Sequence, residues 1–103
     1  MLGLAKELAS DLITCRVCGY HDDDLPYGED GKTPSHNICP CCGVEHGYED
    51  ISLVAVLRYR GNWISGGGKW FSPRLRPAGW DMVRQLSLIP AQWLPTGETK
   101  ARS

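Results

Sequence analysis

The sequence predicts a small α+β domain that combines two cysteine-bearing turns with two to three short helices. Two copies of a C-x2-C-Gly pattern, at 15–19 and 39–43, each lie between short β-prone stretches. Apolar residues recur at helical spacing in 2–12 and 53–64, and a further short helix is expected at 82–88. A chain of 103 residues has the length of one such domain.

The two cysteine turns predict a metal site. A tetrahedral metal bound by sulfur needs four thiolates that converge about 2.3 Å from the ion. Two C-x2-C pairs separated by 20 residues supply these four sulfurs, and the glycine after each pair can adopt the positive φ of a tight turn. Gly43 directly follows Cys42, which favours Cys42 over Cys41 as the last ligand. The expected ligands are Cys15, Cys18, Cys39 and Cys42.

Other interpretations of these residues predict different chemistry. Disulfides fit less well, because five cysteines are an odd number and the N-terminus does not resemble a secretory signal. Cys41 is expected to point away from the metal as a buried or half-buried side chain, with a reactive thiol as the alternative. His36 and His46 are near in sequence, but four cysteines already complete a tetrahedral site. Zn²⁺ is the expected ion and iron the alternative, because four thiolates also hold redox-active iron.

The first half of the chain adds a helix, a loop and a strand to this site. A short amphipathic helix is expected at 2–12. A loop rich in Asp, Gly and Pro is expected at 22–35, and its acidic residues lack the spacing of a calcium-binding loop. Residues 35–38 are expected to form the strand that enters the second turn. Three carboxylates follow that turn without a companion nucleophile, so surface or capping roles are expected for Glu45, Glu49 and Asp50.

The second half is predicted to be helical and rich in tryptophan. The helix at 53–64 can be capped by Asp50 or Ser52, and three glycines at 66–68 end it without the context of a phosphate-binding loop. Residues 69–80 are aromatic, basic and interrupted by proline, so we expect an irregular segment seated by its aromatic side chains. Asp81 is expected to cap the helix at 82–88.

The expected organisation is a single domain over residues 1–95. Its metal unit spans 13–50 and its helical, tryptophan-rich unit spans 52–95, with no linker between them. Residues 96–103 are polar and expected to be a disordered tail. No apolar run long enough for a transmembrane helix occurs, and reduced cysteines without an export signal favour a cytoplasmic location.

Charge is distributed unevenly along a chain whose net charge is −1. Residues 1–51 hold ten acidic and three basic side chains, and residues 52–103 hold two acidic and eight basic ones. The simpler interpretation is that the two halves attract each other across the fold. The alternative is two oppositely charged faces that serve two kinds of partner.

Two resemblances follow from these motifs. The cysteine turns resemble the metal-binding knuckles of rubredoxins and zinc ribbons, which implies a small zinc-ribbon fold. More of the chain, about residues 14–88, resembles the bacterial cysteine-rich CPCC family of small proteins. That family implies a metal-bound ribbon without an established activity, and a position beside toxins in some bacteria implies an immunity or toxin-neutralising role. The residues that carry this resemblance are Cys15–Tyr20, Ile38–Gly43, Gly47–Asp50, Trp63–Ile64, Gly68 with Trp70–Ser72, and Trp80–Asp81 with Gln85–Leu86.

These observations predict a non-enzymatic protein-binding module stapled by a metal. A zinc with four protein ligands has no open position for water or substrate. Either the acidic loop at 22–30 or the basic aromatic surface would bind the partner, and the acidic loop would suit a basic protein such as a toxin. One alternative is a nucleic-acid-binding protein, and another is a rubredoxin-like iron electron carrier. The candidate nucleic-acid contacts are the basic residues of the segment 58–76, namely Arg58, Arg60, Lys69, Arg74 and Arg76.

Overall fold

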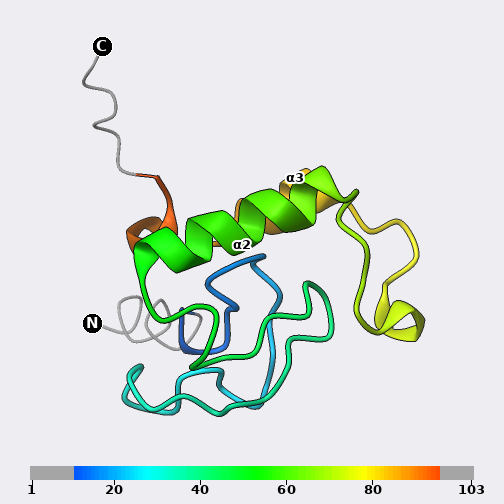
Figure 1. Ribbon diagram of the computed structural model, residues 1–103. Helices are drawn as coiled ribbons and strands as arrows, with labels where there is room; N and C mark the ends of the chain where they lie inside the picture. The colour runs from blue at the N-terminus through cyan, green and yellow to red at the C-terminus, as the bar shows by residue number, and fades with distance from the viewer. Residues whose placement is uncertain (1–10, 96–103) are drawn as a thin grey trace.

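The computed structural model describes residues 11–95, which form a layer of loops covered by helices (Figure 1). The loops of residues 11–50 contain both cysteine turns, and the helices follow them in the chain. The helical elements after residue 50 are α2 (Leu53–Ser65), η1 (Pro73–Leu75), α3 (Met82–Leu86) and η2 (Ala91–Trp93). Figure 1 shows α2 lying along one side of the loop layer.

The predicted α+β class and its zinc-ribbon fold are wrong for the described residues. Residues 11–95 contain no β-strand and only two isolated antiparallel bridges, Thr14 with His21 and Ile38 with Glu45. In the strand expected at 35–38, His36 has a φ of 63°, which is incompatible with extended backbone. Each cysteine turn is therefore closed by one bridged pair, and the chain bends away before a ladder can form.

The predicted helix at 53–64 is present as α2 and extends to Ser65. Ser52 is its N-cap, because its hydroxyl accepts a hydrogen bond from the Ala55 N–H at 3.1 Å. Its buried residues are Val56, Arg60 and Trp63, a helical spacing that directs one face onto the loop layer. The expected helix at 2–12 lies outside the described residues except for its last two positions, which are helical.

The short helix predicted at 82–88 ends two residues earlier, as α3. Asp81 caps it as expected, with its carboxylate accepting from the N–H groups of Val83 and Arg84. The segment 69–80 is irregular apart from η1, in agreement with its composition. The tail predicted at 96–103 lies outside the described residues.

The core contains sulfur and aromatic rings in place of a large aliphatic cluster. Its buried members are the five cysteines, three valines and two tryptophans: Cys15, Val17, Cys18, Cys39, Cys41, Cys42, Val44, Val56, Trp63 and Trp70. The indoles of Trp70 and Trp80 meet edge to face, with ring centres 5.5 Å apart. The Nε1 of Trp63 donates to the carbonyl oxygen of Lys69 at 2.9 Å, which holds the irregular segment against α2. Within residues 11–95, no helix combines the length and apolar character needed to cross a bilayer.

Candidate metal centre

The two cysteine turns have the same backbone structure. In the first, the Gly19 N–H donates to the carbonyl oxygen of Cys15 at 3.0 Å, and in the second Gly43 donates to Cys39 at 2.9 Å. Both glycines have positive φ, 88° and 82°, where a side chain would be strained. The repeated C-x2-C-Gly sequence therefore builds the same turn twice.

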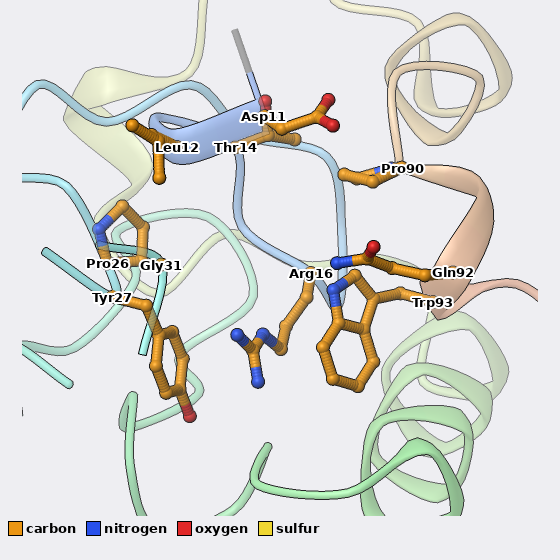
Figure 2. A pocket seen from close by; sticks show the side chains of 10 residues that line it. All are labelled: Asp11, Leu12, Thr14, Arg16, Pro26, Tyr27, Gly31, Pro90, Gln92 and Trp93. Atoms are coloured by element: carbon orange, nitrogen blue, oxygen red, sulfur yellow. The ribbon is translucent and has the colours of Figure 1, made fainter. Parts of the chain in front are cut away.

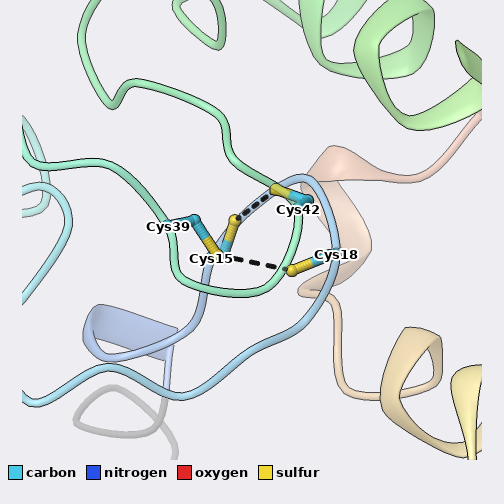
Figure 3. A group of neighbouring side chains, drawn as sticks. All are labelled: Cys15, Cys18, Cys39 and Cys42. Carbon is cyan, nitrogen blue, oxygen red and sulfur yellow. Dashed lines mark hydrogen bonds between the residues drawn. The ribbon is translucent and has the colours of Figure 1, made fainter. Parts of the chain in front are cut away.

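These turns bring together the four cysteines that the sequence selected (Figure 3). All four Sγ atoms lie within 4.8 Å of one another, and all four residues are buried. The Sγ atoms of Cys15 and Cys42 are 3.9 Å apart, and those of Cys18 and Cys39 are 3.7 Å apart. Four sulfurs at 2.3 Å from a tetrahedral ion would be separated by about 3.8 Å. The cluster can therefore hold a metal ion, and its S–S distances exceed the roughly 2.05 Å of a disulfide.

The pKa values of three of the buried thiols are shifted. Burial raises the pKa of Cys18 and of Cys42, and hydrogen bonds from the surrounding thiols, Cys15 first, lower the pKa of Cys39. A divalent ion bound to four thiolates would carry a formal charge of about −2, so the protein around it would have to stabilise negative charge.

A buried arginine of α2 supplies positive charge at the first turn. Arg60 donates from Nε to the carbonyl oxygen of Val17 at 2.6 Å and from Nη2 to that of Arg16 at 2.8 Å. The same Nη2 donates to the carbonyl oxygen of Trp93 at 2.7 Å. Burial lowers the pKa of Arg60, and the negative charge of the nearby cysteines opposes this shift.

Neighbouring helical residues hold the second turn and the fifth cysteine. The hydroxyl of Tyr59 donates to the carbonyl oxygen of Cys42 at 3.1 Å. From α3, Nε2 of Gln85 donates to the carbonyl oxygen of Cys18 at 3.0 Å and to Sγ of Cys41 at 3.3 Å. Cys41 is fully buried and does not belong to the group of four, as expected from its place in the pattern.

The two histidines also lie outside the group of four. His36 is exposed, and His46 is 1% exposed with Nδ1 at 2.8 Å from Oδ2 of Asp50. The hydroxyl of Tyr27 donates to Oδ1 of the same carboxylate, and the Gly47 N–H donates to it at 2.8 Å. Burial raises the pKa of Asp50, but the hydrogen bonds from His46, Tyr27 and Gly47 outweigh it and leave the pKa lowered.

Sequence reasoning missed this buried network. The i,i+4 spacing of His46 and Asp50 was the available signal, but nothing in the sequence places Tyr27 beside them. Asp50 is consequently an internal acceptor, neither the cap of α2 nor part of a surface carboxylate group.

Arg16, inside the first cysteine turn, connects that turn to two distant segments (Figure 2). Its guanidinium lies between two aromatic rings, 3.5 Å from the ring centre of Tyr27 and 3.9 Å from that of Trp93. Its Nη1 also donates to the carbonyl oxygen of Asp50 at 3.2 Å. This contact joins the acidic loop, the turn before α2 and η2 to the metal-binding end of the molecule.

The structure separates the five basic residues proposed for nucleic acid. Lys69 and Arg76 line one shallow depression together, and Arg74 is exposed nearby on η1. Arg58 lines a different depression, with Tyr48 and Glu49. Arg60 is directed inward, as described above.

The acidic loop presents exposed carboxylates. Asp23, Asp24, Glu29 and Asp30 are exposed. Asp30 also orders its own turn, because it accepts from the N–H groups of Lys32 and Thr33 at 2.8 and 3.0 Å. These hydrogen bonds, that from Lys32 first, lower the pKa of Asp30.

The geometry defines a class of small protein in which loops converge at four cysteines and are covered by helices. The uncharacterized protein YozI of Bacillus subtilis (strain 168) is 36% identical over 78 residues, which cover 60% of this chain and 64% of YozI. The uncharacterized protein YoaQ of the same strain is 35% identical over 71 residues, which cover 52% of this chain and 58% of YoaQ. The chain thus matches less than two thirds of the length of either relative.

No family model matches the chain, and no solved structure matches it either. Membership of the CPCC family therefore stays a prediction.

Proposed function

We propose that this chain is a non-enzymatic protein-binding module whose loops are fastened by one Zn²⁺ bound to Cys15, Cys18, Cys39 and Cys42. The observation that carries the proposal is the convergence of four buried sulfurs within 4.8 Å of one another. Four protein ligands complete the coordination of zinc and leave no position for a substrate, which is the pattern of structural sites.

Zinc and iron both accept four thiolates, so a direct measurement must distinguish them. Elemental analysis of the natively expressed protein should give one zinc per chain and a colourless solution. A stoichiometric iron content with the red colour of a ferric tetrathiolate would instead support the electron-carrier alternative. Reduced thiols bound to zinc suit a cytoplasmic location, which we include in the proposal.

The proposed partner surface combines the acidic loop with apolar side chains beside it. Ile51 is 64% exposed and lines a depression together with Tyr27 and Lys32 of the loop region. The exposed carboxylates of this loop suit a basic protein, because the charges steer association and exclude acidic competitors. A basic toxin is the class of partner we favour.

Affinity capture from the source cells, with mass spectrometry of retained proteins, tests this surface. The neutralised variant D23N/D24N/E29Q changes only exposed carboxylates of the loop. Arg58→Gln is the control, because it changes one exposed charge in a different depression. We expect a basic protein to be retained by the wild type and the control and lost from the neutralised variant. Retention of the same proteins by all three baits would contradict the proposal.

A further inference from the structure

A second surface, formed by basic and aromatic side chains, lies around Trp80. Two shallow depressions share the half-buried indole of this residue. One is lined by Lys69, Trp70 and Arg76 among others, and the other by Tyr20, His21 and Arg84 among others. We call the two together the Trp80 groove.

Among residues 11–95, the cations of the Trp80 groove have no ion-pair partner. The one ion pair among residues 11–95 is that of His46 with Asp50, so Lys69, Arg76 and Arg84 are unpaired within the described chain. All three are exposed, and no carboxylate lines the depression that contains Lys69 and Arg76.

Two carboxylates lie near the other depression. Asp81 lines it, but its Oδ1 accepts from the N–H groups of Val83 and Arg84 at 3.0 and 3.3 Å. Asp22 is close enough to add to the effect of burial in raising the pKa of Tyr20. Arg84 is the one arginine or lysine that lines this depression. Over the whole Trp80 groove, three such cations stand against these two acids, and Asp81 already accepts two backbone hydrogen bonds.

The aromatic side chains of the groove form a pre-organised apolar floor. The Trp70 ring meets the Tyr20 ring edge to face at a centre-to-centre distance of 5.6 Å. It also meets the indole of Trp80 edge to face. The Nε1 of Trp80 donates to Oε1 of Gln85 at 2.8 Å, which fixes the indole against α3. The guanidinium of Arg76 lies 5.3 Å from the centre of the Trp80 ring. Charge and ring surface are therefore held next to each other in the groove.

We propose that the Trp80 groove binds single-stranded nucleic acid. Single strands are recognised by cationic grooves that follow the phosphates and by aromatic rings that contact the bases. The groove offers cations on both sides of one indole, so a ligand must carry several negative charges along its length. An acidic polypeptide supplies such charges without planar bases, and inorganic phosphate occupies one depression at most. This function goes beyond the protein-binding role, which uses the acidic loop.

The test is fluorescence anisotropy of labelled dT and rU oligonucleotides of about twelve nucleotides, titrated with the full metal-loaded chain. The double variant K69A/R76A removes two exposed cations from one depression, and Arg84→Ala removes one from the other. Arg58→Ala is the matched control, since this exposed arginine lies outside the groove. We expect at least tenfold weaker binding for the double variant, a loss of a few-fold for Arg84→Ala, and a change below about twofold for the control.

Salt and competition complete the experiment. Each lost phosphate contact should reduce the slope of log affinity against log salt by about 0.7, so the double variant should lose about 1.4. Metal content and circular dichroism of every variant must match the wild type. Absence of binding at low salt overturns the proposal, as does equal weakening by Arg58→Ala. Competition by poly-glutamate as effective as by unlabelled oligonucleotide would overturn it in favour of an acidic protein.

Discussion

Nε of Arg60 donates to the carbonyl oxygen of Val17 at 2.6 Å, which places a guanidinium from α2 against the first cysteine turn. The residue before it, Tyr59, binds the second turn through the carbonyl oxygen of Cys42. Two consecutive side chains of one helix thus position both halves of the metal centre. The helix therefore helps to position the cysteine cluster, although it contributes no sulfur.

Arg60→Met should weaken both the fold and the metal site. It removes a buried cation and leaves carbonyl oxygens unpaired, which we expect to cost about 3 kcal/mol. Urea unfolding of the metal-loaded protein measures this loss, and competition with a chelator should show faster metal release. Arg58→Met, an exposed change on the same helix, should stay within about 0.5 kcal/mol. Equal stability of the two variants would show that the contact with Val17 is unimportant.

Metal retention should distinguish Cys42 from Cys41, which are adjacent in sequence and both buried. Cys42→Ala removes one of four converging sulfurs and should abolish stoichiometric metal. Cys41→Ala removes a sulfur outside the group and should leave the metal content at one per chain. Elemental analysis of both purified proteins is the measurement, and the reverse result would refute the ligand assignment.

Removal of the metal should unfold the loops. Structural zinc contributes on the order of 10 kcal/mol in small zinc peptides, more than the stability of many small domains. We therefore expect chelation under reducing conditions to cause a cooperative loss of near-ultraviolet circular dichroism, which zinc restores. A spectrum unchanged after complete metal removal would show that the core does not depend on the ion.

Asp50 should make stability depend on acid pH. The pKa of Asp50 is lowered in the folded state. Its contribution to folding stability is therefore present above the unfolded-state pKa of about 3.9 and is lost as pH falls through the folded-state pKa. In Asp50→Asn that contribution is absent, and stability at neutral pH should fall by about 3 kcal/mol. Urea unfolding of both proteins should give a difference that shrinks as pH falls below about 4. A difference independent of pH would exclude the charged hydrogen bonds as its cause.

Gly19 should tolerate no side chain, because a Cβ there would overlap the carbonyl oxygen of Gln85. Gly19→Ala adds this clash to the strain of a φ of 88°, and we expect a loss of about 3 kcal/mol or more. Gly79→Ala is the matched control. Its φ is 76° and a Cβ there meets nothing within 4 Å, so only about 1 kcal/mol of backbone strain is expected. Similar unfolding midpoints for the two variants would contradict this packing.

Local rules explain which features could be predicted from the sequence. The spacing of the cysteines and their following glycines selected the four sulfurs that converge, because each C-x2-C-Gly turn is built from its own backbone hydrogen bonds. The boundaries of α2 also followed from local signals, namely a capping serine, helical periodicity and a glycine stop. The strand predictions were wrong because strand pairing needs several consecutive extended residues. His36 adopts a left-handed conformation that the β-prone pattern does not reveal.

The sequence by itself determined the two cysteine turns, the course of α2 and the division of charge between the two halves of the chain. Only the tertiary structure decided that Arg60 is an internal contact, that His46 and Asp50 meet Tyr27, and that Trp80 joins two cationic depressions. These relationships join residues from separate segments, and their partners are set by the packing of those segments rather than by any local pattern. Interactions within a turn or helix can be recognised from spacing, whereas interactions between segments depend on the whole fold.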